Sequence, residues 1–351
     1  MCYNVYRGDK MIQATRTTLW CDYPIKFDSY RGCGFGCHYC YSINRDVIPT
    51  PLTSVREVVS FIKGKRSKTT NWCDWMIPLR WGVMSDPFQP CELEYRRSLQ
   101  ILKEFADRYY PFIVCTKSTM LQEPEYFDLI KECNCVLQVT ACTPRYSQYE
   151  PNAPSFEERL KMIEKLSKVV KRVIVRIQPY IPHIKDDVIS QIPLYKNVGV
   201  YGLIAEGYYI NDSKRVFEGM EKIPRISMGP RWIYDSNWLM EHFKEIKTRC
   251  KEFGIVFLAG QDDMRDLGDY RDCCVGHPLK DFIGNKWNIN YDCMDFPDIM
   301  NEPYTGHVFK HLSSDADYRI WSRSASFKHI ILSARFAKRM DELCSQVSQL
   351  G

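Results

Sequence analysis

Short runs of β-branched and aromatic residues alternate with longer amphipathic stretches between Tyr23 and about Leu258. Such alternation is typical of parallel strands connected by helices. The pattern predicts an α/β fold, namely an open or partial (β/α)6-type barrel of about six βα units with a C-terminal extension. The predicted strands are residues 25–28, 76–83, 112–116, 136–140, 173–178 and 200–204, with a candidate seventh at 255–258.

Two longer stretches have the spacing of amphipathic helices. Residues 94–109 and 155–170 place apolar side chains three and four positions apart, which is typical of helices that pack on the outside of a sheet. Ser155 followed three residues later by Glu158 is a capping-box signal. The second helix is therefore predicted to start at this pair.

The pattern changes beyond Asp262, where polar and turn-forming residues replace the alternation. Neither a repeat nor a low-complexity linker separates this part from the rest. We therefore predict an N-terminal segment at residues 1–22, a core barrel at residues 23–260 and a C-terminal cap or subdomain at residues 261–351.

Residues that carry chemistry follow three of the predicted strands. Three cysteines follow the first strand, Ser85 and Asp86 follow the second, and Lys117 lies at the end of the third. Barrels of this kind place catalytic groups at the carboxyl ends of their strands. The pattern therefore predicts a single active site at that end of the sheet.

The composition is that of an ordinary globular protein, with 45% hydrophobic and 13% aromatic residues. The start of the chain lacks the apolar core of a signal peptide, and no run approaches the roughly 18 apolar residues of a membrane span. We therefore expect a soluble, cytoplasmic protein with no membrane partner. The formal net charge of +5 would assist the binding of an anion such as a nucleic acid, without identifying one.

Sixteen cysteines are many for a reducing compartment, where a disulfide framework is not expected. Metal or redox chemistry is a better explanation for some of them. Cys115, Cys133 and Cys135 lie in apolar runs, where a free cysteine behaves as a small buried hydrophobe. We expect packing roles for these three.

The loop at residues 30–41, YRGCGFGCHYCY, places Cys33, Cys37 and Cys40 at spacings of four and three. Interspersed glycines allow the tight turns that three thiols need to face one inorganic body. A four-iron cluster takes four thiolates, so three thiolates leave one iron open to another ligand. Zinc is the competing metal, with His38 or a distant cysteine as the fourth ligand, but zinc ribbons usually arrange their ligands as two separated pairs. The spacing favours the cluster.

This CxxxCxxC loop, with Tyr39 before its last cysteine, resembles the signature of the radical S-adenosylmethionine superfamily. The resemblance implies a [4Fe–4S] cluster and S-adenosyl-L-methionine as cofactors. It also implies that the cofactor's amino and carboxylate groups chelate the open iron and that Tyr39 approaches the adenine. An electron donor such as flavodoxin or ferredoxin is the implied protein partner.

Further motifs are similar to one branch of that superfamily, the proteins resembling spore photoproduct lyase. They are SDPFQP at residues 85–90, TKS at 116–118, EPNAPS at 150–155 leading to Arg159 and Leu160, and PYIP at 179–182. The branch carries a hydrogen-donating cysteine just upstream of its Ser-Asp pair. This chain has Val83 there, and its nearest thiol is Cys91, so it departs from the branch at the residue that photoproduct repair needs.

Other residues are candidate cofactor contacts. The resemblance places Lys117 against the cofactor, although a lysine at a strand end also suits an exit to solvent. It places Ser85 and Asp86 at the cofactor's amino group, although Asp before Pro is also a common turn residue. The Thr140 hydroxyl is a candidate hydrogen-bond partner of the cofactor. A buried Arg176 guanidinium would need a partner such as the cofactor's carboxylate or a phosphate.

Cys273 and Cys274 are adjacent, with His277 and Cys293 further along the chain. One of the pair is a candidate catalytic hydrogen donor, in place of the thiol that Val83 lacks. The alternatives are ligation of a second metal and simple packing.

The resulting functional prediction is a radical enzyme. It cleaves S-adenosylmethionine reductively to form a 5′-deoxyadenosyl radical, which abstracts hydrogen from a substrate. The first candidate substrate is a nucleobase or nucleotide in nucleic acid, and a duplex target would have to be flipped out. Radical modification of a peptide or small metabolite is the second hypothesis. A non-catalytic metal-binding module is the third.

Overall fold

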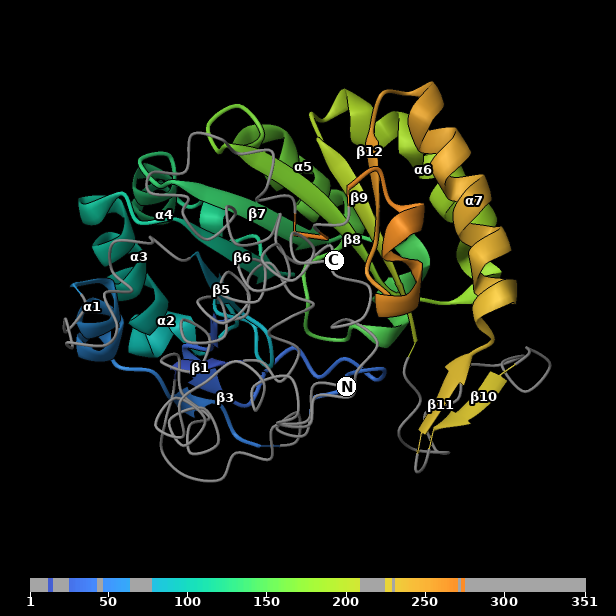
Figure 1. Ribbon diagram of the computed structural model, residues 1–351. Helices are drawn as coiled ribbons and strands as arrows, with labels where there is room; N and C mark the ends of the chain where they lie inside the picture. The colour runs from blue at the N-terminus through green and yellow to red at the C-terminus, as the bar shows by residue number, and fades with distance from the viewer. Residues whose placement is uncertain are drawn as a thin grey trace, which may run out of the picture.

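The computed structural model describes residues 12–14, 25–42, 47–63, 78–208, 225–228, 231–270 and 273–274. Within them, one eight-stranded sheet has the order β1-β2-β5-β6-β7-β8-β9-β12. β1 (Ile12–Ala14) pairs antiparallel with β2, and every other neighbouring pair is parallel. Figure 1 shows this sheet as a curved layer with helices along its outer side. The predicted partial α/β barrel is confirmed.

The bounds of the elements follow the alternation in the sequence. The parallel strands are β2 (Ile25–Phe27), β5 (Leu79–Trp81), β6 (Phe112–Thr116), β7 (Cys135–Thr140), β8 (Arg172–Tyr180), β9 (Gly202–Gly207) and β12 (Val256–Ala259). The helices are α1 (Val55–Lys63), α2 (Glu92–Tyr95), α3 (Arg97–Arg108), α4 (Pro124–Ile130), α5 (Phe156–Leu166), α6 (Lys185–Asn197) and α7 (Ser236–Glu252). Two small ribbons pair β3 (Tyr30–Arg31) with β4 (Thr50–Pro51) and β10 (Arg225–Met228) with β11 (Arg231–Tyr234). Short 3₁₀ helices are η2 (Met120–Gln122), η3 (Pro144–Tyr149), η4 (Pro182–Ile184) and η7 (Asp262–Leu267).

The helix predicted at residues 94–109 is in fact two helices, α2 and α3. Arg96 separates them with a left-handed φ of 51°. The buried Glu92 carboxylate accepts hydrogen bonds from the amides of Ser98 and Leu99, both at 2.8 Å, and so caps the second helix. A carboxylate at a helix N-terminus also opposes the positive end of the helix dipole. By contrast, α5 begins with the predicted capping box of Ser155 and Glu158.

The first half of each strand packs an apolar layer on the inner face of the sheet. Ile113, Val136, Ile174 and Ile204 form this layer and are almost fully buried. Side chains two positions further along a strand point to the same face. The same face therefore continues with Cys115, Gln138, Arg176 and Glu206, a polar layer toward the carboxyl ends of the strands.

The outer face of the sheet is covered by aromatic and aliphatic side chains beneath the helices. Trp81 stacks on Phe27 with ring centroids 5.5 Å apart, and Phe105 of α3 stacks on Phe112 at 4.3 Å. Trp81 is fully buried, and its indole nitrogen donates to the Ser29 hydroxyl at 2.8 Å. This packing holds β2, β5 and β6 in place behind the polar layer.

None of the helices in the described part of the chain is long and apolar enough to cross a membrane. The C-terminal segment predicted as a cap lies mostly outside the described residues. The predicted domain boundaries at residues 22 and 260 therefore stay predictions.

Candidate functional site

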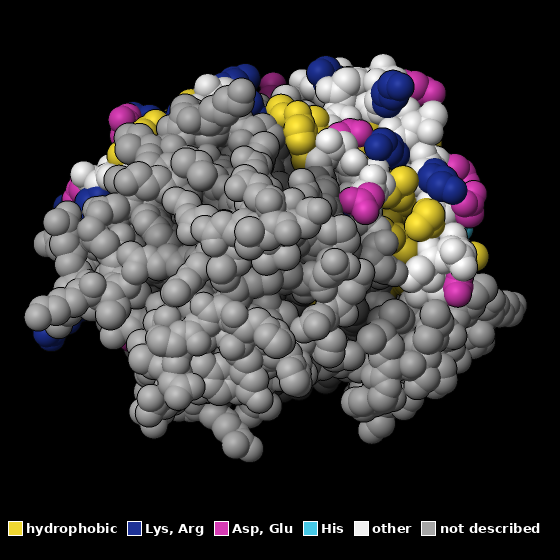
Figure 2. Space-filling view, viewed as in Figure 1, with side chains coloured by type: hydrophobic (Ala, Val, Ile, Leu, Met, Phe, Trp, Pro, Cys, Tyr) yellow, Lys and Arg dark blue, Asp and Glu magenta, His cyan; other side chains and the backbone are white. Residues whose placement is uncertain are grey.

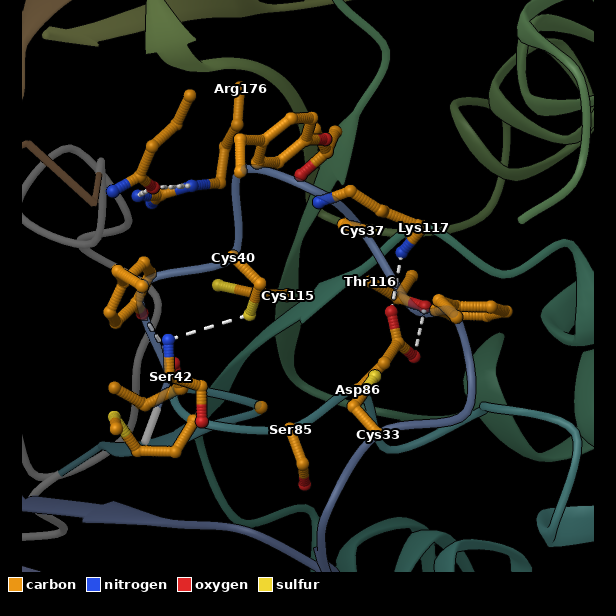
Figure 3. Close-up of a pocket in the computed structure, with 18 of the residues that line it drawn as sticks. Cys33, Cys37, Cys40, Ser42, Ser85, Asp86, Cys115, Thr116, Lys117 and Arg176 are labelled. Atoms are coloured by element: carbon orange, nitrogen blue, oxygen red, sulfur yellow. Dashed lines mark hydrogen bonds between the residues drawn. The ribbon is translucent and has the colours of Figure 1, made fainter. Parts of the chain in front are cut away.

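A cavity opens at the carboxyl ends of the parallel strands, where the sequence predicts the active site. Its free volume is about 140 Å³, roughly ten times what a single water molecule requires. Nine of the predicted site residues line it, and Figure 3 shows most of them: Cys33, Cys37, Tyr39, Cys40, Ser85, Asp86, Lys117, Thr140 and Arg176. The cavity therefore brings together residues from the cysteine loop and from strands β5 to β8.

The cysteine loop needs two of its three glycines for their backbone conformation. Gly32 and Gly36 have φ of +83° and +64°, a region that other residues rarely adopt. Gly34 has no such φ. Its amide donates to Oε1 of Gln89 at 2.7 Å, while Nε2 of Gln89 donates to the carbonyl of Gly32 at 3.0 Å. The Asn152 amide donates to the carbonyl of Gly34 at 3.0 Å, so two separate segments hold the loop.

Replacing Gly32 by alanine is expected to destabilise this loop. A Cβ at Gly32 would lie 2.3 Å from the carbonyl oxygen of Val47, in addition to the cost of about 1–2 kcal/mol for a left-handed alanine. Gly34→Ala is the matched control, because its nearest neighbour would be an ordinary contact at 3.6 Å. Urea unfolding of both variants should show a loss above about 1 kcal/mol for Gly32→Ala alone. Equal losses would show that the conformation at Gly32 is not limiting.

Burial makes two of the loop's three thiols hard to ionise. It raises the pKa of Cys33 to about 12, with the Asp86 carboxylate adding to the effect. Burial also raises the pKa of Cys37 to about 12, against the opposing influence of the Lys117 ammonium. Metals bind the thiolate rather than the thiol, so a metal centre held here must itself offset the cost of ionisation.

In the part of the chain that the structure describes, no group of three or more His, Cys, Asp or Glu side chains is placed to hold a single metal ion. The prediction of a cluster rather than zinc rests on the spacing of the cysteines in the sequence. It stays a prediction. His38, the zinc alternative, is exposed and is not among the residues that line the cavity.

Tyr39 is anchored by a buried ion pair. Its hydroxyl donates to the Glu150 carboxylate, whose other oxygen accepts from the Arg159 guanidinium. The side chains of Glu150 and Arg159 are only 1% and 4% exposed. Arg159 also donates to the carbonyl of Thr140 at 2.9 Å. This chain of contacts links the cysteine loop to α5 and to the end of β7, and it fixes the ring that sits between Cys37 and Cys40.

Asp86 connects the loop after β5 to the end of β6. Its carboxylate accepts from the amide of Phe88 at 2.9 Å, the hydroxyl of Thr116 at 2.8 Å and the amide of Lys117 at 2.6 Å. Burial raises the pKa of Asp86, although these hydrogen bonds act in the opposite direction. The Lys117 ammonium lies 5.5 Å from the centroid of the Tyr39 ring, on the side of the cavity where the loop passes.

Ser85 lies in the turn that follows β5. The buried carboxylate of Asp28, the residue directly after β2, orders this turn. Asp28 accepts hydrogen bonds from the amides of Val83, Met84 and Ser85 at 2.8, 2.9 and 3.2 Å. The Ser85 hydroxyl donates to the carbonyl of Tyr30 at 2.7 Å. Its predicted contact with the cofactor's amino group stays a prediction.

Arg176 reaches the polar layer and has protein partners there. Nη1 donates to Oε1 of Gln138 at 2.7 Å, and Nε donates to Oε1 of Gln178 at 3.0 Å. Glu206 forms an ion pair with Nη2 of Arg176 at 3.4 Å.

The Gln138 oxygen that accepts from Arg176 also accepts from the Cys115 thiol, at 3.1 Å. Cys115 lines the cavity, so this cysteine has one side open to the site as well as the expected packing against its strand neighbours.

Cys273 and Cys274 do not line the cavity. Cys274 is 1% exposed and packs against the apolar layer of Ile113, Val136 and Ile174, with Cys273 beside it. Cys91, the nearest thiol to the turn after β5, also lies outside the cavity lining. His277 and Cys293 lie outside the described residues. The hydrogen-donor role of the pair stays a prediction.

Sequence reasoning missed several residues that shape the site. In the sequence, Glu150 and Arg159 stand out only as parts of a motif, because their nine-residue separation does not show that they form a buried ion pair. Gln89 was likewise seen only within its motif. The sequence does not indicate that Arg80 lines the cavity, because the alternation of residues in β5 does not show which face of the sheet borders it.

Comparisons with known proteins show the fold. No protein-family model and no curated protein matches the sequence. Spore photoproduct lyase complexed with dinucleoside spore photoproduct has a TM-score of 0.53 at 13% identity, covering 72% of this chain and 80% of that chain. A double mutant of that enzyme with bound AdoMet and the dinucleoside has 0.54 at 11%, covering 72% and 79%. SuiB from Streptococcus suis bound to S-adenosylmethionine has 0.48 at 10%, covering 68% and 51%. The chain has the partial-barrel fold of spore photoproduct lyase.

Proposed function

We propose that this chain is a radical S-adenosylmethionine enzyme whose Cys33, Cys37 and Cys40 hold a [4Fe–4S] cluster. The observation that carries the proposal is that all three thiols, from one glycine-rich loop, line a single cavity at the carboxyl ends of the strands. The likeness of fold to an enzyme that has been solved with AdoMet bound supports it. Three thiolates would leave one iron for the cofactor.

When bound together, the cluster and S-adenosylmethionine supply a carbon radical able to take hydrogen from a substrate C–H bond. The chain's own residues position and shield this chemistry. Gln89 and Asn152 hold the cysteine loop. The Tyr39 ring is fixed through Glu150, so it presents a constant surface for the adenine. Five neighbouring strands, β5 to β9, contribute to the cavity lining and would limit the access of water to the reacting groups.

We assign cofactor recognition to polar and charged residues that line the cavity. Lys117 is the candidate partner of the cofactor's carboxylate, since its ammonium lies beside the cysteine loop. Ser85 and Asp86 remain the candidates for the amino group, because an ionised carboxylate can accept more hydrogen bonds than the three it receives here. Thr140, at the end of β7, is a candidate hydrogen-bond partner of the ribose.

The proposed substrate is a nucleobase or nucleotide within nucleic acid. The solved spore photoproduct lyase complexes hold a dinucleoside substrate, and the net charge of +5 would attract a polyanion. Modification of a peptide or small metabolite is the competing proposal, favoured by Val83, which offers no thiol at the turn after β5.

The substrate proposal is tested with the reduced, reconstituted enzyme and labelled cofactor. Oligonucleotide is expected to stimulate 5′-deoxyadenosine formation and to exchange label with it. The stimulation should fall as salt rises, because phosphate contacts release counterions. Nucleotides, peptides and fractions of cell extract serve as the comparison substrates. Activity on a peptide or metabolite fraction, without stimulation by any nucleic acid at low salt, would reject the nucleic-acid proposal.

A further inference from the structure

A fourth cysteine lines the cavity, in addition to the three of the loop. Cys115 is in β6, where the other four residues are buried, and its own side chain is half-buried. Among the described residues that line the cavity, it is the only cysteine outside the loop (Figure 3). A thiol that is not a proposed cluster ligand therefore borders the space in which a substrate would react.

Hydrogen bonds hold this thiol in one orientation. Sγ of Cys115 donates to Oε1 of Gln138 at 3.1 Å. Gln138 lies in register with Cys115 on the neighbouring strand β7 and is fully buried. The same Oε1 accepts from Nη1 of Arg176 at 2.7 Å, so the carboxamide cannot turn over without losing both bonds. Gln138 therefore orients an S–H bond at the wall of the cavity.

Gln138 also has a hydrogen-bond donor to spare. Its Nε2 is buried and has no hydrogen-bond partner in the part of the chain that the structure describes. A buried donor of this kind costs about 1–3 kcal/mol while it is unpaired. Gln138 lies between Cys115 and Arg176 in the sheet, and both of these line the cavity. The unpaired donor points to a bound molecule with an acceptor atom, such as a carbonyl oxygen, next to the thiol.

Hydrogen-atom transfer to carbon requires a weak bond to hydrogen. An S–H bond is weaker than an alkyl C–H bond, so a carbon radical is stabilised when it takes hydrogen from a thiol. The O–H and N–H bonds of Ser85, Thr116 and Lys117 are too strong to react in this way. The turn after β5 contributes Val83 and Met84 to the lining, and neither has an S–H bond.

Two tyrosine hydroxyls are the competing donors, because a phenolic O–H bond is also weak. The Tyr39 hydroxyl donates to the buried Glu150 carboxylate, and the Tyr41 hydroxyl donates to the carbonyl of Val83. These are hydrogen bonds from oxygen to oxygen, whereas a thiol is only a weak hydrogen-bond donor. The Cys115 hydrogen is therefore released from its acceptor at the lower cost.

We propose that Cys115 is a hydrogen-atom donor to a carbon radical formed in the cavity. The inference rests on the proposed function and adds a catalytic residue to it. The S–H bond breaks homolytically and a C–H bond forms, which leaves a sulfur radical on Cys115. One electron from the low-potential reductant that serves the cluster and one proton from water restore the thiol. Because a thiol exchanges its hydrogen with water, the transferred hydrogen comes from solvent.

The test follows solvent deuterium into 5′-deoxyadenosine and needs no identified substrate. The full-length, reconstituted protein is reduced with dithionite in heavy water without added thiols and given S-adenosylmethionine alone, and the nucleoside is examined by mass spectrometry. Most of the wild-type product is expected to carry one deuterium. Cys115→Ser should lose most of this deuterium. Serine can keep the hydrogen bond to Gln138, but its O–H bond is too strong to give hydrogen.

Three variants are the comparisons. Cys91→Ser makes the same one-atom change at a half-buried thiol outside the cavity lining. Cys274→Ser tests the donor that the sequence suggested, and Tyr41→Phe removes the competing phenol. All three should keep the deuterium content of wild type.

Iodoacetamide labelling checks the position of the thiol without any radical step. In the anaerobic, reconstituted wild-type protein, Cys115 should be modified, and S-adenosylmethionine should slow the modification by filling the cavity. Cys250 is the internal reference, because it is fully buried in α7, on the inner side of a helix whose outer surface carries charged side chains (Figure 2). It should stay unmodified.

The donor role would be overturned by wild-type 5′-deoxyadenosine without deuterium, or by unchanged deuterium in Cys115→Ser. An equal loss in any of the three comparison variants, or a Cys115 thiol as unreactive as Cys250, would also overturn it. If wild type forms no 5′-deoxyadenosine at all, the proposed function itself is rejected, and the donor role that rests on it falls as well. Failure of the inference and failure of the function therefore give different results.

Discussion

The Cys37→Ala variant is expected to lose most of the approximately four irons of the reconstituted protein, and its formation of 5′-deoxyadenosine is expected to fall to background. The three thiols of the loop are the proposed cluster ligands, and all three line the cavity with Lys117 and Arg176. Removing one leaves two, too few to hold the cluster and leave a single iron open. Iron and sulfide analysis after anaerobic reconstitution measures the first effect, and labelled cofactor measures the second. Cys33→Ala and Cys40→Ala should behave alike.

Cys91→Ala is the control for the cysteine variants. Cys91 is half-buried like the loop thiols but does not line the cavity, so its loss should leave iron content and cofactor cleavage near wild type. Full iron content and activity in Cys33→Ala, Cys37→Ala or Cys40→Ala would remove that cysteine from the ligand set.

The second large effect is expected on stability. Arg159→Met should lower the free energy of unfolding by about 3–5 kcal/mol, because it leaves the Glu150 carboxylate charged and buried without its partner. Both side chains are almost fully buried, so solvent does not screen the pair. The variant should also bind the cluster less well, since Glu150 holds Tyr39 inside the cysteine loop. Urea unfolding of the unreconstituted protein isolates the first effect.

Two comparisons make this result specific. Glu150→Gln with Arg159→Met removes both charges and should recover part of the loss. Arg249→Met makes the same change in a pair with Glu252, whose side chains are 37% and 52% exposed, and should cost below about 1 kcal/mol. A cost for Arg159→Met no larger than for Arg249→Met would show that the buried pair does not stabilise the loop.

Much of the barrel could be predicted because its strands follow simple rules. Runs such as residues 112–116 are buried on both faces, so they stand out as short apolar stretches between helical patterns. The glycines at 32, 34 and 36 predict left-handed turns in the cysteine loop, and Gly32 and Gly36 have positive φ whereas Gly34 does not. The cysteine loop follows the first strand of the parallel series, so the strand order already placed it at the carboxyl edge with Lys117.

What could not be predicted depends on contacts between distant residues. The break at Arg96 exists because Glu92 caps the following helix, and local periodicity does not contain that information. Tyr39 and Glu150 are 111 residues apart, so their contact appears only after the sheet has curved. Cys115 looked like a packing residue because its strand is apolar, although every second side chain of that strand faces inward.

The most direct test of the account is a single anaerobic experiment on the wild-type chain. After reconstitution with iron and sulfide and reduction with dithionite, the protein is given labelled S-adenosylmethionine, and metal content and nucleoside products are measured together. The account predicts about four irons and four sulfides per chain, with formation of 5′-deoxyadenosine and methionine. One zinc per chain in place of the cluster, or a complete cluster without cleavage of the cofactor, would contradict it.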